Sequence, residues 1–533
     1  MSILLSCRLT DTDHVRPYPG FKSPPMHGDY EAQRHWMEIT TQLPVSQWYF
    51  HDLEWWGLDY PPLTAYHSWL LGQIGTRINP DWFVLYTSRG SDDPILKVFM
   101  RATVLASEFV VYVPAAVVCV RRYSRLSNVS GWTASLALMA LLMQPSLILI
   151  DHAHFQYNNV MLGFVLASMS GLMAGRFAGA AAFFVAALAF KQMALYYCLP
   201  VFFYLLGSCV FPRLKVWRLI SIALATAATG VAMMLPLILG TLHDVHKGID
   251  PRPNLDEPRP PLPLLPQLSQ HLNSEAVYYP ILEQLAQLVL RIFPFARGLF
   301  EDKVANFWCT INLFVKLRNY PAELLQRGAL AATLATSLPP SIVHFVRPHK
   351  PLLLPLGLAT AAWGFFLFSY QVHEKSVLLP LMPMTLLLAG RDGMATSTRA
   401  WVGFANILGA WTMFPLLRRV HLEIPYAVLT LLWAWLLGLP PTSMGAYLDA
   451  SQPKWAQIAL GMIHGTFYTV MIAWHVVEAA VKPPNSMPDL WVVANVGIGA
   501  AGFTLCYVWC FWKLLTESGL LAGQGAGNKA KTR

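Results

Sequence analysis

The chain alternates long apolar runs with short polar connections over most of its length. A helix that crosses a bilayer needs roughly 20 apolar residues. We predict spans near 98–120, 130–150, 159–175, 177–190, 192–211, 217–240, 326–344, 352–369, 376–390, 401–417, 424–440, 456–481 and 490–515. Several of these runs are short, and the pairs at 159–190 and 376–417 are the least regular. The pattern predicts an all-α polytopic membrane protein.

Polar stretches between the apolar runs predict the division of the chain. We expect an N-terminal segment without a span (1–26), a first loop with amphipathic helices (27–97), a first set of membrane helices (98–240), a second loop (241–325), C-terminal membrane helices (326–515) and a tail (516–533). The proline-rich residues 248–266 are expected to lack regular structure.

Two helices are predicted within the first loop. Residues 30–43 place apolar side chains roughly on one face, with Glu31, Arg34, His35 and Glu38 elsewhere, which predicts a helix lying along the membrane surface. Pro61-Pro62 predicts the start of a second, shorter helix, because proline is favoured at the first helical position.

Composition supports the membrane assignment. Only 13% of the 533 residues are charged and 55% are hydrophobic, whereas soluble domains average about 25% charged residues. The net charge of +9 does not predict nucleic-acid binding, because Lys and Arg gather in the cytoplasmic loops of membrane proteins. The seven Cys residues show neither a disulfide framework nor zinc-ligand spacing.

The basic residues also predict an orientation. The cytoplasmic side is expected to hold 121–125, 176, 213–218, 347–350, 391–399 and 529–533, with Arg418-Arg419 as an exception on the opposite side. The first loop and residues 151–159, 241–325 and 370–375 then share the non-cytoplasmic face. The acidic and aromatic loops are therefore predicted to meet at one face.

Acidic and aromatic side chains are dense between Met26 and Tyr66. Aromatic rings pack on the C–H surfaces of sugars, and carboxylates bind hydroxyl groups or remove their protons. Asp29 stands just before a predicted helix, so a helix cap and a catalytic base are equally good interpretations. Asp59 stands before the second predicted helix, where a cap is the simpler interpretation.

Four further polar clusters interrupt apolar runs. Residues 151–159 favour a polar wall for a phosphate or sugar over a metal site, because their two His are spaced i, i+2 rather than i, i+4. Lys191 is either a snorkelling lysine or a phosphate contact. Residues 297–308 suit an internal salt-bridge network, and residues 371–375 are either a connecting loop or a phosphate site.

The sequence contains no glycine-rich phosphate loop after a strand and no dinucleotide-binding pattern. A soluble nucleotide-sugar donor is therefore not indicated. Basic groups at membrane depth fit a lipid-linked donor.

These motifs, in their order along the chain, resemble the endoplasmic reticulum dolichyl-phosphate-glucose-dependent α-1,3-glucosyltransferases. The resemblance runs from about residue 17 to the C-terminus and is carried by residues 28–40, 55–66, 154–158, 191–193, 295–308 and 372–376. It is strongest to the branch that adds the first glucose to lipid-linked Man9GlcNAc2. The second-glucose branch lacks the Trp-Trp-Gly before Leu-Asp-Tyr-Pro-Pro that stands at Trp55–Pro62 here.

The resemblance implies a GT-C glycosyltransferase fold in the endoplasmic reticulum membrane with a luminal active site. It implies inverting transfer from dolichyl phosphate glucose to a lipid-linked oligosaccharide, with no metal, no other cofactor and no nucleic-acid partner. The family's catalytic base falls on Asp29, and its phosphate-contacting His falls on His373. Lys375 and Arg297 are weaker candidates for the same phosphate. We also predict substrate contacts from three residues: Arg34, Asp59 and His154.

Two features depart from the family or add to it. Family members carry a span before the first luminal loop, and residues 1–26 contain no such apolar run. The tail Lys529–Arg533 resembles a dilysine retrieval signal, which suits residence in the endoplasmic reticulum.

Three alternatives stay open. The first is the paralogous transferase that adds the second glucose, or a related enzyme that uses dolichyl phosphate mannose. The second is a secondary transporter, although the chain shows no obvious internal repeat and its polar clusters gather at one face. The third is a catalytically inactive scaffold, against which the intact Asp29 argues.

Overall fold

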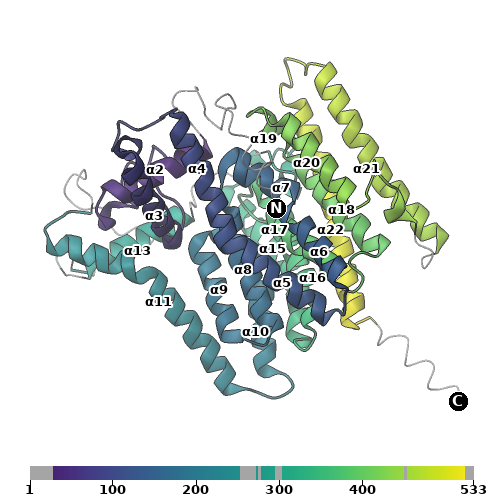
Figure 1. The fold of residues 1–533 in the computed structure, drawn as a ribbon, viewed down its shortest axis with the longest axis horizontal. Helices are drawn as coiled ribbons and strands as arrows, with labels where there is room; N and C mark the ends of the chain where they lie inside the picture. Colours follow the sequence, from purple (N-terminus) through teal and green to yellow (C-terminus); the bar gives the residue numbers. More distant parts are fainter. Residues whose placement is uncertain are drawn as a thin grey trace.

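The computed structural model describes residues 28–251, 272–273, 276, 278–293, 303–448 and 453–521, and all regular structure within these ranges is helical (Figure 1). The first loop contains α2 (Asp29–Gln42) and α3 (Pro62–Ile78). The other principal helices are α4 (Pro94–Ser107), α5 (Val113–Leu126), α6 (Gly131–Leu142), α8 (Asn158–Met173), α9 (Phe177–Phe190), α10 (Cys198–Val210), α11 (Val216–His246), α13 (Tyr279–Ile292), α15 (Ala322–Val346), α16 (Leu354–Phe368), α17 (Leu378–Leu386), α18 (Thr396–Thr412), α20 (Glu423–Leu436), α21 (Lys454–Ala480) and α22 (Leu490–Ser518). The short helices are α7 (Pro145–Ile148), α14 (Phe307–Ile311) and α19 (Phe414–Arg418).

In the described part of the chain, eight helical segments are long and apolar enough to cross a membrane. Three shorter apolar helices, α8, α9 and α20, accompany them. On α11, large apolar side chains such as Leu224 and Val231 are exposed, as expected of a helix that faces lipid. By contrast, α8, α16 and α17 are buried along most of their lengths, so these helices are apolar on all sides because they form the interior of the bundle.

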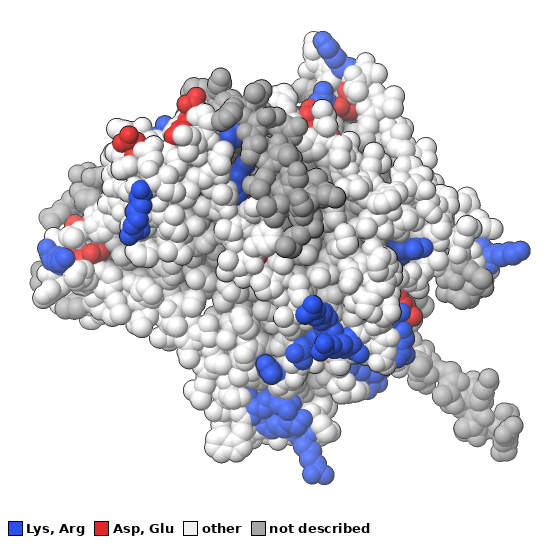
Figure 2. Space-filling view, viewed as in Figure 1, with Lys and Arg blue, Asp and Glu red and all other residues white. Residues whose placement is uncertain are grey.

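Basic residues gather at one end of the bundle. They lie at the end of α5, between α10 and α11, between α15 and α16, and between α17 and α18. Figure 2 shows Lys and Arg side chains concentrated in the lower half of the view, whereas acidic side chains lie mostly in the upper half. Arg418, which stands among the residues of the opposite side, forms an ion pair with Glu478 of α21.

The first loop packs against one end of the bundle as a compact unit with α11 and α13 (Figure 1). The predicted helix at 30–43 is present as α2, but its expected polar face is not exposed. Every residue from Tyr30 to Thr40 is buried. The charged side chains of α2 tolerate this burial because they pair with one another.

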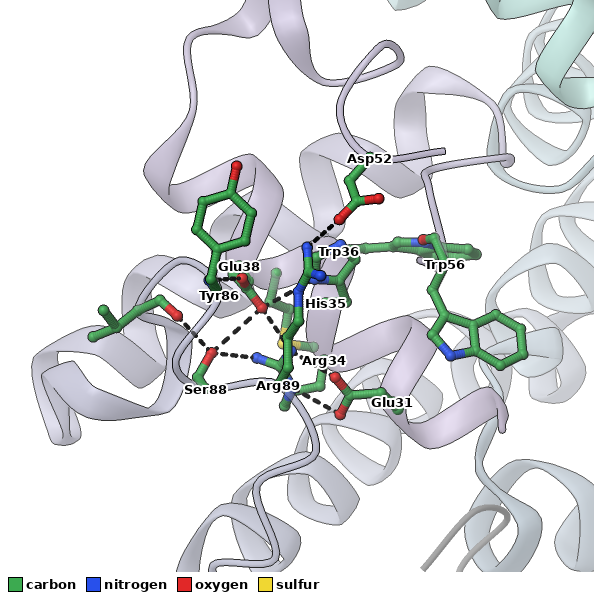
Figure 3. Close-up of polar contacts among 12 residues, drawn as sticks. Glu31, Arg34, His35, Trp36, Glu38, Asp52, Trp56, Tyr86, Ser88 and Arg89 are labelled. Atoms are coloured by element: carbon green, nitrogen blue, oxygen red, sulfur yellow. Dashed lines mark hydrogen bonds and ion pairs between the residues drawn. The ribbon is translucent and has the colours of Figure 1, made fainter. Parts of the chain in front are cut away.

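Arg34 is the centre of this pairing (Figure 3). Its Nε and Nη2 donate to the two oxygens of Glu31 at 2.9 and 2.7 Å, and Nη2 also donates to Glu38 Oε2 at 2.6 Å. Its Nη1 donates to Ser88 Oγ at 2.7 Å. Glu38 Oε1 in turn accepts from the backbone N–H of Tyr86 at 2.8 Å. The network therefore fastens the segment after α3 onto α2.

Glu38 is ionised in this environment. Burial alone would raise the pKa of its carboxyl group, but hydrogen bonding from His35 and the charge of Arg34 lower that pKa from 4.5 to about 2. The ion-pair network is therefore complete at neutral pH.

Replacement of Arg34 by Met is expected to lower the free energy of unfolding by about 3–5 kcal/mol, because it leaves two buried carboxylates without their cation. The measurement is thermal unfolding of the detergent-purified protein. Arg327→Met is the matched control, because Arg327 forms an exposed ion pair with Glu323 on α15. Equal losses in the two variants would contradict a structural role for the Arg34 network.

Acid should remove the contribution of Glu38. Its pKa in the folded protein is depressed, so its stabilisation is full above pH 4.5 and is lost as the pH falls toward about 2. The difference in unfolding temperature between the wild type and Glu38→Gln should therefore narrow across that window. A difference that stays constant with pH would contradict the ion pairing.

Candidate active site

Asp29 is the first residue of α2, at the edge of the first loop that faces the bundle. The helix cap is Gly28, and no side chain caps the helix. The alternative interpretation of Asp29 as a cap is therefore wrong. The same holds for Asp59, because Pro61 occupies the cap position of α3.

The Asp29 carboxylate instead binds two side chains that lie far away in the sequence. Its Oδ2 lies 2.8 Å from Nε2 of His154 and forms an ion pair with Nζ of Lys375. Within the described residues both contacts fall on Oδ2 and none falls on Oδ1. The Asp29 side chain is 22% exposed. One carboxylate oxygen is thus held in place while the other is left for a further ligand.

Asp29 is also held in its charged form. Burial by itself would raise the pKa of its carboxyl group, but the charge of Lys375 and the hydrogen bond with His154 hold that pKa well below its usual range. The group is therefore a carboxylate throughout the neutral range, and it can accept a proton.

His154 is placed by an irregular helical turn. Residues Leu149–Phe155 form a π-helical turn after α7, and Phe155 has a φ of +89°, which is unusual for a residue with a side chain. Insertions of this kind re-aim side chains and recur at functional sites. The Phe155 ring packs edge-on against Tyr30, the neighbour of Asp29, with ring centroids 5.3 Å apart.

The polar residues 151–159 do not converge on one point. Asp151 accepts from the backbone N–H of Asn159 at 2.6 Å and from the side chain of Asn158 at 2.8 Å. His152 lies 2.9 Å from Glu108, and His154 faces Asp29. Because the acid and the two His contact different partners, the geometry disfavours the metal-site alternative for this cluster.

Lys191 lies between α9 and α10 and is only 4% exposed, so the interpretation of a snorkelling lysine is wrong. Its ammonium donates to Asn158 Oδ1 at 2.7 Å and to Gln156 Oε1 at 3.1 Å. It also lies 4.8 Å from the centroid of the Tyr60 ring. Lys191 therefore connects the polar segment after η4 (Leu149–Phe155) to the first loop.

These groups form one electrostatic cluster. The charges of Lys375, Asp151, Asp29 and Asp59 all act on the ammonium of Lys191. The structure therefore brings Asp29, His154 and Lys375 into direct contact and places Asp59 in their vicinity. His373 is exposed in the same connection as Lys375, two residues earlier.

Arg34, another predicted substrate-binding residue, is not in this cluster. Arg34 uses its guanidinium nitrogens on Glu31, Glu38, Ser88 and the Trp82 carbonyl, which argues for a structural role. Arg297 lies outside the described residues. Conversely, the amide oxygens that hold Lys191 were not predicted. The one signal for them was a lysine between two apolar runs, which does not reveal its partners.

The sequence of the chain matches the ALG6, ALG8 glycosyltransferase family over residues 2–251 and 271–512. The chain belongs to this family. It is 42% identical over 511 residues to a probable dolichyl pyrophosphate Man9GlcNAc2 alpha-1,3-glucosyltransferase of Schizosaccharomyces pombe, an alignment that covers 95% of this chain and 90% of that protein.

Two other relatives carry the same enzyme name. The Saccharomyces cerevisiae protein is 40% identical, with 97% of this chain and 90% of that protein covered. The Gallus gallus protein is 36% identical, with 96% and 95% covered. Among solved structures, ArnT from Cupriavidus metallidurans bound to undecaprenyl phosphate matches with a TM-score of 0.42 at 12% identity, covering 97% of this chain and 76% of that one.

Replacement of Lys191 by Met should lower the free energy of unfolding by about 1–3 kcal/mol, because the buried amide oxygens of Gln156 and Asn158 lose their donor. Thermal unfolding in detergent measures this loss. Lys454→Met, at an exposed lysine that begins α21, is the control and should have no effect. An unchanged Lys191→Met protein would show that these contacts contribute nothing to the fold.

Proposed function

We propose that the chain transfers glucose from dolichyl phosphate glucose to the terminal mannose of Man9GlcNAc2-diphosphodolichol, forming an α-1,3 linkage with inversion. The reaction takes place at the luminal face of the endoplasmic reticulum membrane, in a protein of GT-C architecture. The observation that supports this best is the Asp29 carboxylate, which is ionised, oriented through Oδ2 and partly exposed. Membership of the family supplies the reaction class.

Asp29 is the general base of this proposal. Its Oδ1 takes the proton of the mannose 3-hydroxyl while that oxygen attacks the anomeric carbon of glucose. The bond from the anomeric carbon to the phosphate oxygen breaks, and its electron pair stays on the phosphate. Because a phosphate leaves readily as an anion, no general acid has to protonate it. A single carboxylate therefore suffices.

The phosphate of the donor needs positive charge nearby. Lys375 and His373 lie in the connection between α16 and α17, which also places Lys375 against Asp29. Contacts between cations and phosphate oxygens are charge-assisted and stronger than neutral hydrogen bonds. This connection is our proposed phosphate site, with Asp59 and His154 contributing to the surrounding polar wall.

The names of the relatives support the assignment to the first glucose, and the first-loop motif at 55–62 is held in place by its backbone carbonyls. The carbonyl of Trp56 accepts from Trp36 Nε1 at 2.9 Å, and the carbonyl of Gly57 accepts from Arg291 of α13 at 2.7 Å. A Cβ on Gly57 would lie 2.8 Å from Leu53 Cα, so this position requires glycine. The motif thereby shapes the segment that presents Asp59 toward the cluster.

Glucosyl transfer by the purified chain tests the proposal. With dolichyl phosphate glucose and a Man9GlcNAc2 lipid-linked acceptor, we expect transfer by the wild type and a loss of roughly 10²- to 10⁴-fold in Asp29→Asn. Asp92→Asn, which changes an exposed acid of the same loop, is the matched control and should keep full activity.

Other outcomes would overturn parts of this proposal. Transfer only to an acceptor that already bears one glucose would identify the second-glucose reaction. Full activity of Asp29→Asn would remove Asp29 from the role of base and make Asp59 the next residue to test.

A further inference from the structure

The arrangement around Asp29 contains a conflict between structure and chemistry. A general base must accept a proton, yet the carboxylate of Asp29 is engaged by a cation, the ammonium of Lys375. An adjacent cation stabilises the charged form of a carboxylate and makes it a weaker proton acceptor. The ion pair therefore works against the reaction in which Asp29 takes part, unless the cation moves away before the proton is transferred.

The position and flexibility of the Lys375 side chain would allow it to move from one anion to another. It stands in the short 3-10 turn Glu374–Val377 that begins just before α17, and its side chain is 21% exposed. A lysine carries a compact charge on a flexible four-carbon stem, so it can turn between two anions without a change in the backbone. Among the residues that the structure describes, Asp29 is the one ion-pair partner of Lys375.

A second cation makes this partner exchange easier. The positive charges of Lys375 and Lys191 act on one another, and Lys191 is fixed by Gln156 and Asn158. An anion that binds beside Lys375 would relieve this repulsion. The phosphate of a lipid-linked sugar donor is such an anion, and it must lie close to Asp29 because the bond that breaks joins this phosphate to the carbon under attack.

We propose that Lys375 exchanges partners during the reaction: it leaves the Asp29 carboxylate for the donor phosphate, so that donor binding frees the catalytic base. This inference rests on the proposed function. His154 keeps its contact with Oδ2 and maintains the orientation of the carboxylate, which makes His154 a positioning residue. Lys375 then stabilises the charge that gathers on the departing phosphate.

The exchange orders the reaction steps. No bond is made or broken when Lys375 moves, since only an ion pair is replaced. Proton transfer from the mannose hydroxyl to Asp29 follows, together with glycosyl transfer to the mannose oxygen and departure of the phosphate with its electron pair. Asp29 is a weak base until a donor is present, so the site is not set for chemistry with the acceptor alone.

Asp29 and the donor phosphate therefore compete for one lysine, and this competition is measurable without turnover. The probe is dolichyl phosphate glucose, whose binding to the purified full-length chain is followed by tryptophan fluorescence in the absence of acceptor. Asp29→Asn releases Lys375 and should tighten binding roughly 10- to 100-fold, the range for a charge-assisted contact. Lys375→Met should weaken binding by a similar factor.

The double variant decides between exchange and a fixed pair. If Lys375 changes partners, Asp29→Asn gives a much smaller gain in the Lys375→Met background than in the wild type. If the gain is the same in both backgrounds, or if Asp29→Asn weakens binding, the exchange does not occur. Dolichol, which has the same chain without a phosphate, should bind all four proteins equally.

The pH dependence of the wild type gives a second measurement that needs no variant to fold. Among the described residues, the groups that face Asp29 are His154 and Lys375, with Lys191 and Asp59 nearby. Departure of Lys375 lets the pKa of Asp29 return toward its ordinary value of 3.8, so the donor complex binds more protons and donor affinity should rise as the pH falls toward that value. Affinity that does not change with pH would overturn the exchange. Absence of glucosyl transfer would refute the proposed function but leaves this binding test decisive.

Discussion

Two contacts on one carboxylate oxygen hold together the functional end of this molecule. Asp29 lies 125 residues from His154 and 346 residues from Lys375 along the chain, yet Oδ2 meets both. These contacts join α2 of the first loop, the π-helical turn after α7 and the connection between α16 and α17. Each of these three segments is held in place by a further feature of the fold. The Arg34 network fixes α2, Lys191 holds the residues after the π-helical turn, and the buried α16 and α17 hold the connection.

The cost of burying charge explains why so many of these residues occur in pairs. A lone ion removed from water is expensive, and breaking a buried pair leaves an uncompensated charge. Arg34 meets two carboxylates, and Lys191 meets two amide oxygens and a ring. Such groups are fixed. The Asp29–Lys375 pair differs because both side chains are about one-fifth exposed, so its exchange for another ion pair costs less.

The sequence predicted the helical class, the gathering of basic connections at one end, and a shared face for the first loop with Asp29 and the connection with Lys375. It could not show whether Arg34 faces substrate or protein, because the answer depends on how Tyr86 and Ser88 pack against α2. Nor could periodicity reveal the π-helical turn that aims His154, since an inserted residue leaves no regular pattern. Composition also could not distinguish an apolar helix buried inside the bundle, such as α8, from one that faces lipid.

In the proposed reaction a single base, Asp29, drives one displacement at the anomeric carbon. A single displacement inverts the configuration, so the β-linked glucose of the donor must arrive as an α-linked glucose. The most direct measurement is the anomeric configuration of the new linkage in the isolated product, from the proton coupling constant of the transferred glucose. An α linkage agrees with one base and one step. A β linkage would require a second displacement with a covalent intermediate, and it would contradict the account.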